Sequence, residues 1–312
     1  MDIFLKSISG ILVILGMILV GFVIGEKGWF DDKSRSLIAK LVTQIALPCY
    51  MLYTITQRFT AADLLKMLPA LRFPALSMVV LLGIATAVAR IFAVRQDRRG
   101  LFISMFFNSN TIFVGLPINQ ALFGDDSIPY VLIYYMCNTT FFWTLGTYLI
   151  QRDGEGEAQF DLKTSVKKVF SPPLMGFILG LVMVMLQIKL PAFLASDLQY
   201  LGNLTTPLSM IFIGLSVSHV GVKQLVLGKD QLLILLGRFV VAPLLMATIV
   251  YWVPLPSLMK QVFIIQSAMP VMTNAPVVAR LYGADSDYAA VMVTETTLAT
   301  MVVIPILMVL MA

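Results

Sequence analysis

The chain is a succession of long apolar runs separated by short clusters of charged and turn-forming residues. A helix needs about 20 apolar residues to cross the ~30 Å hydrocarbon layer of a bilayer, and ten runs approach that length. They cover residues 8–25, 36–56, 70–93, 101–122, 128–150, 171–188, 199–219, 231–252, 259–281 and 287–311. Because the runs are long and unbroken rather than short and alternating, they predict helices and not the strands of a membrane barrel.

Composition agrees with a polytopic membrane protein. Of the 312 residues, 59% are hydrophobic and 12% are charged, whereas a soluble domain is roughly 45–50% apolar and about 25% charged. So few charges argue against a soluble enzyme, a disordered chain and a nucleic-acid module. The sequence also shows no phosphate-binding glycine loop and no pairing of a nucleophile with a base. We therefore predict no enzyme activity, no metal site and no cofactor other than a coupling ion.

The positive charges predict how the ten spans are oriented. Of the 22 Lys and Arg residues, 15 fall on one side of the membrane, six fall on the other and one, Arg238, lies within a span. The positive-inside rule places the richer side in the cytoplasm and both termini outside. We expect the chain in a bacterial inner membrane.

The longest hydrophilic stretch, residues 151–168, divides the ten spans into two sets of five. We expect a first repeat at 1–150, a cytoplasmic linker at 151–168 and a second repeat at 169–312. A displacement of 159 residues carries Pro48 onto Pro207 and Pro117 onto Pro276, as a weak internal repeat would. Five is odd, so the second set enters the membrane in the opposite sense, and such inverted repeats suit alternating access.

Spans four and nine each contain a predicted break. Residues 107–120 read Phe-Asn-Ser-Asn-Thr-Ile-Phe-Val-Gly-Leu-Pro-Ile-Asn-Gln, and residues 266–276 read Gln-Ser-Ala-Met-Pro-Val-Met-Thr-Asn-Ala-Pro. Proline within a helix removes a backbone hydrogen bond, and glycine lowers helix propensity, so both spans should unwind near mid-membrane. Freed backbone groups cannot face lipid, and paired broken helices in transporters mark a binding site.

The restarting half-helices would present N–H groups whose partial positive charge suits a carboxylate. Polar and helix-breaking residues surround both breaks, and Asn138 of span five joins them. The candidate substrate-binding residues are Asn108, Asn110, Thr111, Gly115, Pro117, Asn138, Gln266, Thr273, Asn274 and Pro276.

Two charged residues lie well inside the predicted spans, away from their ends: Arg238 in span eight and Glu295 in span ten. Such residues are costly in lipid and are often functional. In one interpretation Glu295, with Thr296 and Thr297, carries a proton or a cation, and Arg238 is a partner to it or to an anionic substrate. In the other, Glu295 and Arg238 pair with each other or locally and only hold helices together, or Arg238 extends to the membrane surface.

At these residues the sequence resembles the auxin efflux carrier family, which includes plant PIN carriers and bacterial permeases for malate, malonate and similar acids. The match is carried by Asn110-Thr-Ile-Phe-Val-Gly-Leu-Pro117, by Leu47-Pro48 and by residues 279–283, Ala-Arg-Leu-Tyr-Gly. The resemblance implies crossing helices four and nine, a transport domain of spans three to five and eight to ten, and a scaffold of spans one, two, six and seven. It also implies elevator-like motion and a homodimer.

We therefore expect an all-α secondary transporter of small organic anions, mono- or dicarboxylates, with lipid and a second copy of the chain as its other partners. The coupling ion is left open between H⁺ and Na⁺. One alternative is a sodium-coupled carrier of bulkier amphipathic acids, such as indole or bile-acid-like compounds, which the distantly similar bile-acid sodium symporter group suggests. Another is a ligand sensor that keeps the fold without transport.

Overall fold

A computed structural model describes residues 2–154, 169–220 and 228–311. Within these residues every regular element is helical. Of the predicted linker at 151–168, residues 155–168 lie outside the described residues.

The elements of the first half follow in chain order. They are α1 (Asp2–Glu26), α2 (Asp32–Leu41), η1 (Val42–Ala46), α3 (Leu47–Arg58), α4 (Ala61–Met67), η2 (Leu68–Leu71), α5 (Arg72–Ile91), η3 (Gln96–Arg98), α6 (Arg99–Phe107), α7 (Gly115–Phe123), η4 (Asp125–Ser127), α8 (Ile128–Phe141), η5 (Phe142–Gly146) and α9 (Thr147–Gln151).

The second half is also helical. Its elements are α11 (Pro172–Met185), α12 (Ala192–Asn203), α13 (Thr205–Val220), α14 (Lys229–Leu236), η7 (Gly237–Val241), α15 (Ala242–Tyr251), α16 (Ser257–Ser267), α17 (Ala275–Leu281) and α18 (Ser286–Met311). Three short elements, η1, η5 and η7, are π-helical turns within longer helices, and such turns are frequent at functional sites.

Helical residues occupy each of the ten apolar runs. Within the described residues, five continuous helices are long and apolar enough to cross a membrane, and two shorter apolar helices accompany them. The five are Lys33–Arg58, Ala61–Ile91, Ala192–His219, Lys229–Tyr251 and Ser286–Met311, and the two are Leu12–Glu26 and Pro172–Met185. The prediction of an all-helical membrane protein agrees with these elements.

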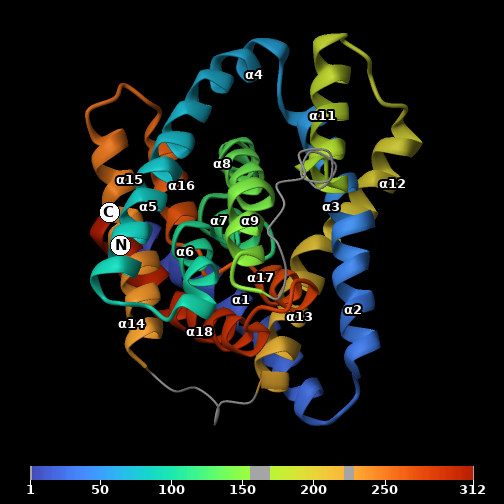
Figure 1. The fold of residues 1–312 in the computed structure, drawn as a ribbon. Helices are drawn as coiled ribbons and strands as arrows, with labels where there is room; N and C mark the ends of the chain where they lie inside the picture. The colour runs from blue at the N-terminus through green and yellow to red at the C-terminus, as the bar shows by residue number, and fades with distance from the viewer. Residues whose placement is uncertain (1, 155–168, 221–227, 312) are drawn as a thin grey trace.

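The helices form two groups on either side of a central set, α6 to α9 (Figure 1). On one side α3 packs against α11 and α12, whereas α1 begins on the opposite side and runs along α13 through the middle of the molecule. On the other side α5 packs against α6, α8 and α15, while α15 contacts α16 and α17 contacts α18. Each group therefore combines helices from both halves of the chain.

Buried apolar side chains fall into three clusters that follow this grouping. The largest lies within the group of α5, α6, α8, α15, α16 and α18, with Phe102, Phe106 and Phe263 among its members. A second joins α3 and α11 to α7 and α8, and a third joins α1 and α13 to α7, α16 and α18. The contact between the two groups is thus largely apolar.

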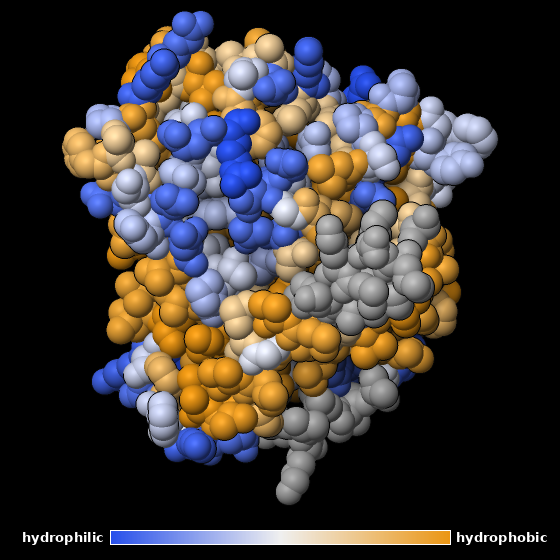
Figure 2. All heavy atoms as spheres, turned by 180° about the vertical axis from the view of Figure 1, so that it is seen from behind, coloured by the Kyte–Doolittle hydropathy of each residue, from blue (hydrophilic) through white to orange (hydrophobic). Residues whose placement is uncertain are grey.

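The outer surface is unusually apolar. Large hydrophobic side chains such as Leu12, Leu76, Leu244 and Val302 are more than half exposed. Figure 2 shows a broad hydrophobic band on one face, with hydrophilic residues gathered above it and at its lower edge. A contiguous apolar surface of this extent fits contact with lipid.

Helices α1 and α13 approach each other closely because each has a glycine at the contact. A Cβ placed at Gly21 would collide with the carbonyl oxygen of Ile211, and one at Gly214 would collide with that of Ile18. Small residues at a helix interface allow this backbone-to-backbone packing in membranes.

We predict that Gly21→Ala destabilises the protein by about 1–3 kcal/mol, because the added methyl group has no room without separating α1 from α13. Gly16→Ala on the same helix is the matched control, since a Cβ there meets nothing within 4 Å; this change is expected to be neutral or slightly stabilising. Thermal unfolding of the detergent-purified variants measures both. Equal unfolding midpoints for the two variants would contradict this helix contact.

Candidate functional site

Two non-helical segments interrupt the central helices. Residues 108–114 lie between α6 and α7, and residues 268–274 lie between α16 and α17. Pro117 and Pro276 stand in the first turn of the restarting helices α7 and α17, where a proline loses little because the first N–H groups of a helix are unpaired anyway. The prolines therefore favour helix starts at these places.

The two segments contact each other directly. The backbone N–H of Asn110 donates to the carbonyl oxygen of Pro270 at 2.8 Å, and Nε2 of Gln266 donates to the carbonyl oxygen of Thr111 at 3.3 Å. A Cβ at Gly115 would collide with the side-chain amide of Gln266. A larger residue at position 115 would displace the Gln266 side chain from its place at the start of α7.

Each segment is also held by a side chain of a neighbouring helix. Asn138 of α8 makes two hydrogen bonds with the backbone of Ser109: its Oδ1 accepts from the N–H at 2.9 Å, and its Nδ2 donates to the carbonyl at 2.7 Å. On α18, the hydroxyl of Thr296 accepts from the N–H of Val271 at 3.0 Å. These bonds satisfy backbone groups that helix interruption leaves free.

Arg238 of η7 binds the carboxyl-terminal ends of two helices at once. Its guanidinium donates to the carbonyl oxygens of Phe106, Ser267 and Met269. The side chain is fully buried, so the alternative in which Arg238 extends to the membrane surface is wrong. In the described part of the chain it forms no ion pair with Glu295.

A cavity of about 490 Å³ lies where these segments face α3 and α11. Its lining carries hydroxyl, amide and aromatic groups, and none of the described lining residues is Asp, Glu, Lys or Arg. The polar and aromatic lining residues are Thr43, Gln44, Asn110, Thr111, Phe113, Tyr135, Thr139, Trp143, Phe170, Ser171, Thr273 and Asn274. A pocket of this size is typical of small-molecule sites.

Comparison with known proteins adds the family. A family model described as membrane transport protein matches residues 7–308. The chain belongs to the membrane transport protein family. It is 27% identical over 299 residues to an uncharacterized transporter of Methanocaldococcus jannaschii, covering 94% of this chain and 95% of the relative. It is 26% identical to an uncharacterized transporter of Methanothermobacter thermautotrophicus, covering 97% and 98%.

The resemblance to the auxin efflux carrier family is therefore confirmed, and the protein is a membrane transporter. Both relatives are archaeal, so a bacterial inner membrane stays a prediction.

Four of the predicted binding residues of the transporter line the cavity: Asn110, Thr111, Thr273 and Asn274. The other six stand outside the lining and surround the breaks. They are Asn108, Gly115, Pro117, Asn138, Gln266 and Pro276.

Sequence reasoning missed part of the lining. Thr43 and Gln44 form a polar pair inside the apolar second run, a signal that could have been found. Tyr135, Trp143 and Ser171 carry no such signal, because their place in the cavity depends on how distant helices pack.

Within Asn110 the two amide atoms differ in their partners. Its Oδ1 accepts the N–H of Phe113 at 3.2 Å, whereas its buried Nδ2 has no hydrogen-bond partner in the described residues. An unpaired buried donor is costly. Asn110 lines the cavity, but Nδ2 has almost no exposed surface of its own, so a ligand reaches this donor only if its neighbours shift.

Glu295 of α18 is buried, and neither carboxylate oxygen has a hydrogen-bond partner among the described residues. Its neighbours Thr296 and Thr297 donate their hydroxyls to carbonyls of their own helix, Met292 and Val293 respectively. Burying an unpaired carboxylate is expensive, so Glu295 is the candidate for binding a proton or cation.

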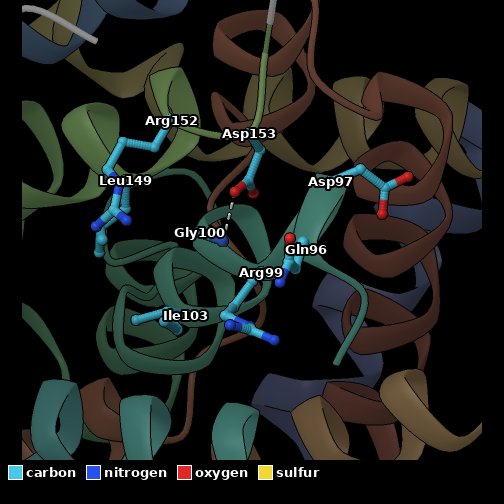
Figure 3. Close-up of a pocket in the computed structure, with 8 residues that line it drawn as sticks. All are labelled: Gln96, Asp97, Arg99, Gly100, Ile103, Leu149, Arg152 and Asp153. Atoms are coloured by element: carbon cyan, nitrogen blue, oxygen red, sulfur yellow. Dashed lines mark hydrogen bonds between the residues drawn. The ribbon is translucent and has the colours of Figure 1, made fainter. Parts of the chain in front are cut away.

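A second cavity of about 500 Å³ lies at the start of α6 (Figure 3). The Asp153 carboxylate accepts the N–H groups of Gly100 and Leu101 at 2.9 and 2.6 Å and so caps that helix. Burial raises the pKa of Asp153, while the two hydrogen bonds act in the opposite direction. Among the described residues, Arg99 and Arg152 share this lining with Asp97 and Asp153.

We predict that Asn138→Ala destabilises the transporter, because it leaves the backbone N–H of buried Ser109 unpaired, at about 1–3 kcal/mol. The Ser109 carbonyl keeps one partner, the N–H of Thr111 at 3.0 Å. Thermal unfolding of the purified protein measures the loss. Asn203→Ala is the control, since Asn203 is exposed at the end of α12. An unfolding midpoint of Asn138→Ala as high as that of the control would show that this side chain does not support the break.

Proposed function

We propose that the protein is a secondary active transporter of small organic anions, mono- or dicarboxylates, which bind in the cavity at the two interrupted helices. The observation that carries the proposal is the lining: residues of both non-helical segments, Asn110 to Phe113 and Met272 to Asn274, face one cavity together with hydroxyl and amide side chains. Paired interrupted helices are a common design for transporter binding sites.

Several features favour an anion. The described lining includes the amide of Asn110 and the hydroxyls of Thr139 and Ser171, and none of its described residues is a carboxylate that would repel a negative ligand. Helices α7 and α17 begin directly after the two lining segments, so their positive N-terminal ends add to the attraction. A carboxylate is therefore accommodated without a positively charged side chain among the described lining residues.

The helix bounds support two inverted five-helix repeats, spanning 1–150 and 169–312. Phe107 and Ser267, the residues that end α6 and α16, are 160 positions apart, and so are Gly115 and Ala275, which begin α7 and α17. With an odd number of spans per repeat, the halves are oppositely oriented. We place both termini outside a plasma membrane, and we propose a homodimer.

The packing supports alternating access by relative motion of two groups. We propose a scaffold of α1, α2, α3, α11, α12 and α13 and a moving unit of α4 to α9 and α14 to α18. One end of their interface carries a polar bridge: Asp125 of η4 pairs with Arg58 of α3 at 2.5 Å and accepts from Tyr50 at 3.3 Å. The cavity lies nearer the other end of α3, at Leu47.

A bulkier acid is the second candidate substrate. Phe113, Tyr135, Trp143 and Phe170 give the cavity an aromatic side, and its volume exceeds what a three- or four-carbon acid fills. Aromatic rings pack well against an amphipathic organic acid. The same site could thus serve either class, and transport measurements separate them.

Uptake into proteoliposomes, with imposed proton or sodium gradients, tests the function with a panel of short dicarboxylates, monocarboxylates, and indole and steroid acids. Accumulation of the short acids is expected. Accumulation of the bulky acids alone would favour the second candidate, and saturable binding without any flux would favour a sensor and overturn the transporter proposal.

We predict that Asn110→Ala raises the half-saturating substrate concentration about ten- to hundredfold, the effect of losing one hydrogen bond to a charged group. Asn110→Asp should be worse, because it replaces the Nδ2 donor by a negative charge. Asn108→Ala is the matched control, since this amide lies in the same break but outside the cavity lining. Equal effects of Asn108→Ala and Asn110→Ala would remove Asn110 from the site.

We also propose that Glu295 binds the coupling ion, a proton or sodium. Glu295→Gln is expected to impair gradient-driven accumulation while exchange of substrate for substrate is less affected, because exchange does not require net ion movement. Asp287→Asn, an exposed acid in the first turn of the same helix, is the control. If accumulation and exchange both stay at the parent level, Glu295 has a structural role.

A further inference from the structure

The carboxyl-terminal ends of α6 and α16 meet inside the protein. The last carbonyl groups of a helix have no partner within the helix and carry partial negative charge. Here α6 ends at Phe107 and α16 at Ser267, and Phe106, Ser267 and Met269 are buried. Two such ends in an apolar interior, away from bulk water, create a site that favours a cation.

Arg238 supplies that cation from η7. Its Nη1 donates to Phe106 O at 3.1 Å and its Nη2 to Ser267 O at 2.5 Å. The oxygen of Met269 accepts from both Nη2, at 2.9 Å, and Nε, at 3.1 Å. The contacts therefore engage all three guanidinium nitrogens with carbonyl oxygens from the ends of both interrupted helices.

No acidic side chain shares this site in the described residues. The ion pairs of the described residues lie elsewhere: Arg58 with Asp125, Arg95 with Asp97 and Arg98 with Asp230. The charge of Arg238 is thus matched only by carbonyl dipoles. Its planar fork of donors reaches several oxygens at fixed angles, which a lysine ammonium cannot do from one position.

We propose that Arg238 is a built-in cation: its guanidinium fills a carbonyl site that would otherwise take a free metal cation, as the ends of discontinuous helices do in other transporters. It thereby fixes the end of α6 against the end of α16. Arg238 acts as a positioning residue, since it is absent from the cavity lining. A consequence, which rests on the proposed function, is that an anion in the cavity needs no alkali cation at this point.

Chemical rescue of the full-length protein tests the proposal without any substrate. Arg238→Ala, purified in detergent, is expected to unfold at least about 5 °C below the parent, since several hydrogen bonds to a charged group are lost. Millimolar methylguanidinium should restore part of that shift, because it fits the vacated site. Arg280→Ala, an exposed arginine at the end of α17, is the control, with a midpoint close to the parent and no response to methylguanidinium.

Two further variants separate charge from packing. Arg238→Met keeps much of the side-chain volume without the charge; it should be as destabilised as Arg238→Ala but should not respond to methylguanidinium, because the space is filled. Arg238→Lys is expected to lie between the parent and Arg238→Met. An Arg238→Met protein as stable as the parent, or no rescue of Arg238→Ala, would overturn the proposal.

Sodium provides a measurement that does not depend on folding of the Arg238 variants. In the Glu295→Gln protein, which lacks the other candidate ion site, replacing choline by sodium at equal ionic strength should leave the unfolding midpoint unchanged. A sodium-dependent rise in that midpoint would mean that the carbonyl site still takes a metal ion. Because these measurements use no organic acid, failure of the substrate assignment would leave their outcome unaffected.

Discussion

The structure depends on satisfying backbone groups that two interrupted helices release in a place that bulk water does not reach. An unpaired N–H or carbonyl there costs several kcal/mol. Side chains of other helices bind these groups: Asn138 binds Ser109, Thr296 binds Val271, and Arg238 binds the ends of α6 and α16. Irregular backbone at the site is therefore held by hydrogen bonds from other helices in addition to the bonds within the segments themselves.

These directional bonds join α6 to α9 and α14 to α18 into one unit, whereas the contact with α1, α3, α11 and α13 is mainly apolar. Apolar contact has no preferred geometry along the surface. Sliding one unit along the other therefore costs less free energy than it would between hydrogen-bonded elements. Polar contacts across this interface include the bridge at Asp125, the bond from Thr206 to Gln120 and the bond between Tyr135 and Ser171. Under the proposed function, the contrast between a bonded interior and a mainly apolar interface favours motion of one unit past the other.

Local pattern was enough to predict that helices occupy the apolar runs, and it pointed to the segments that line the candidate site. The apolar runs locate the helices because lipid requires long apolar segments, and Asn110, Thr111, Thr273 and Asn274 lie in the segments that precede Pro117 and Pro276, which favour new helix starts. Trp143 and the partners of Arg238 could not be predicted, because they depend on how helices distant in sequence pack. The inward orientation of Arg238 could not be predicted either, because the periodicity of the sequence does not reveal that the carbonyl groups at the ends of α6 and α16 surround this side chain.

The charges around the site suggest why a neutral cavity can prefer an anion and still respond to an ion. Arg238 is fixed by four hydrogen bonds and has no carboxylate partner in the described structure, so no ion pair there cancels its positive charge. Under the proposed function, a proton or cation on Glu295 removes a negative charge from α18, while the positive charge of Arg238 is unchanged. Coulomb energies are large in a low-dielectric interior, so occupation of Glu295 would strengthen binding of an anion and couple the two.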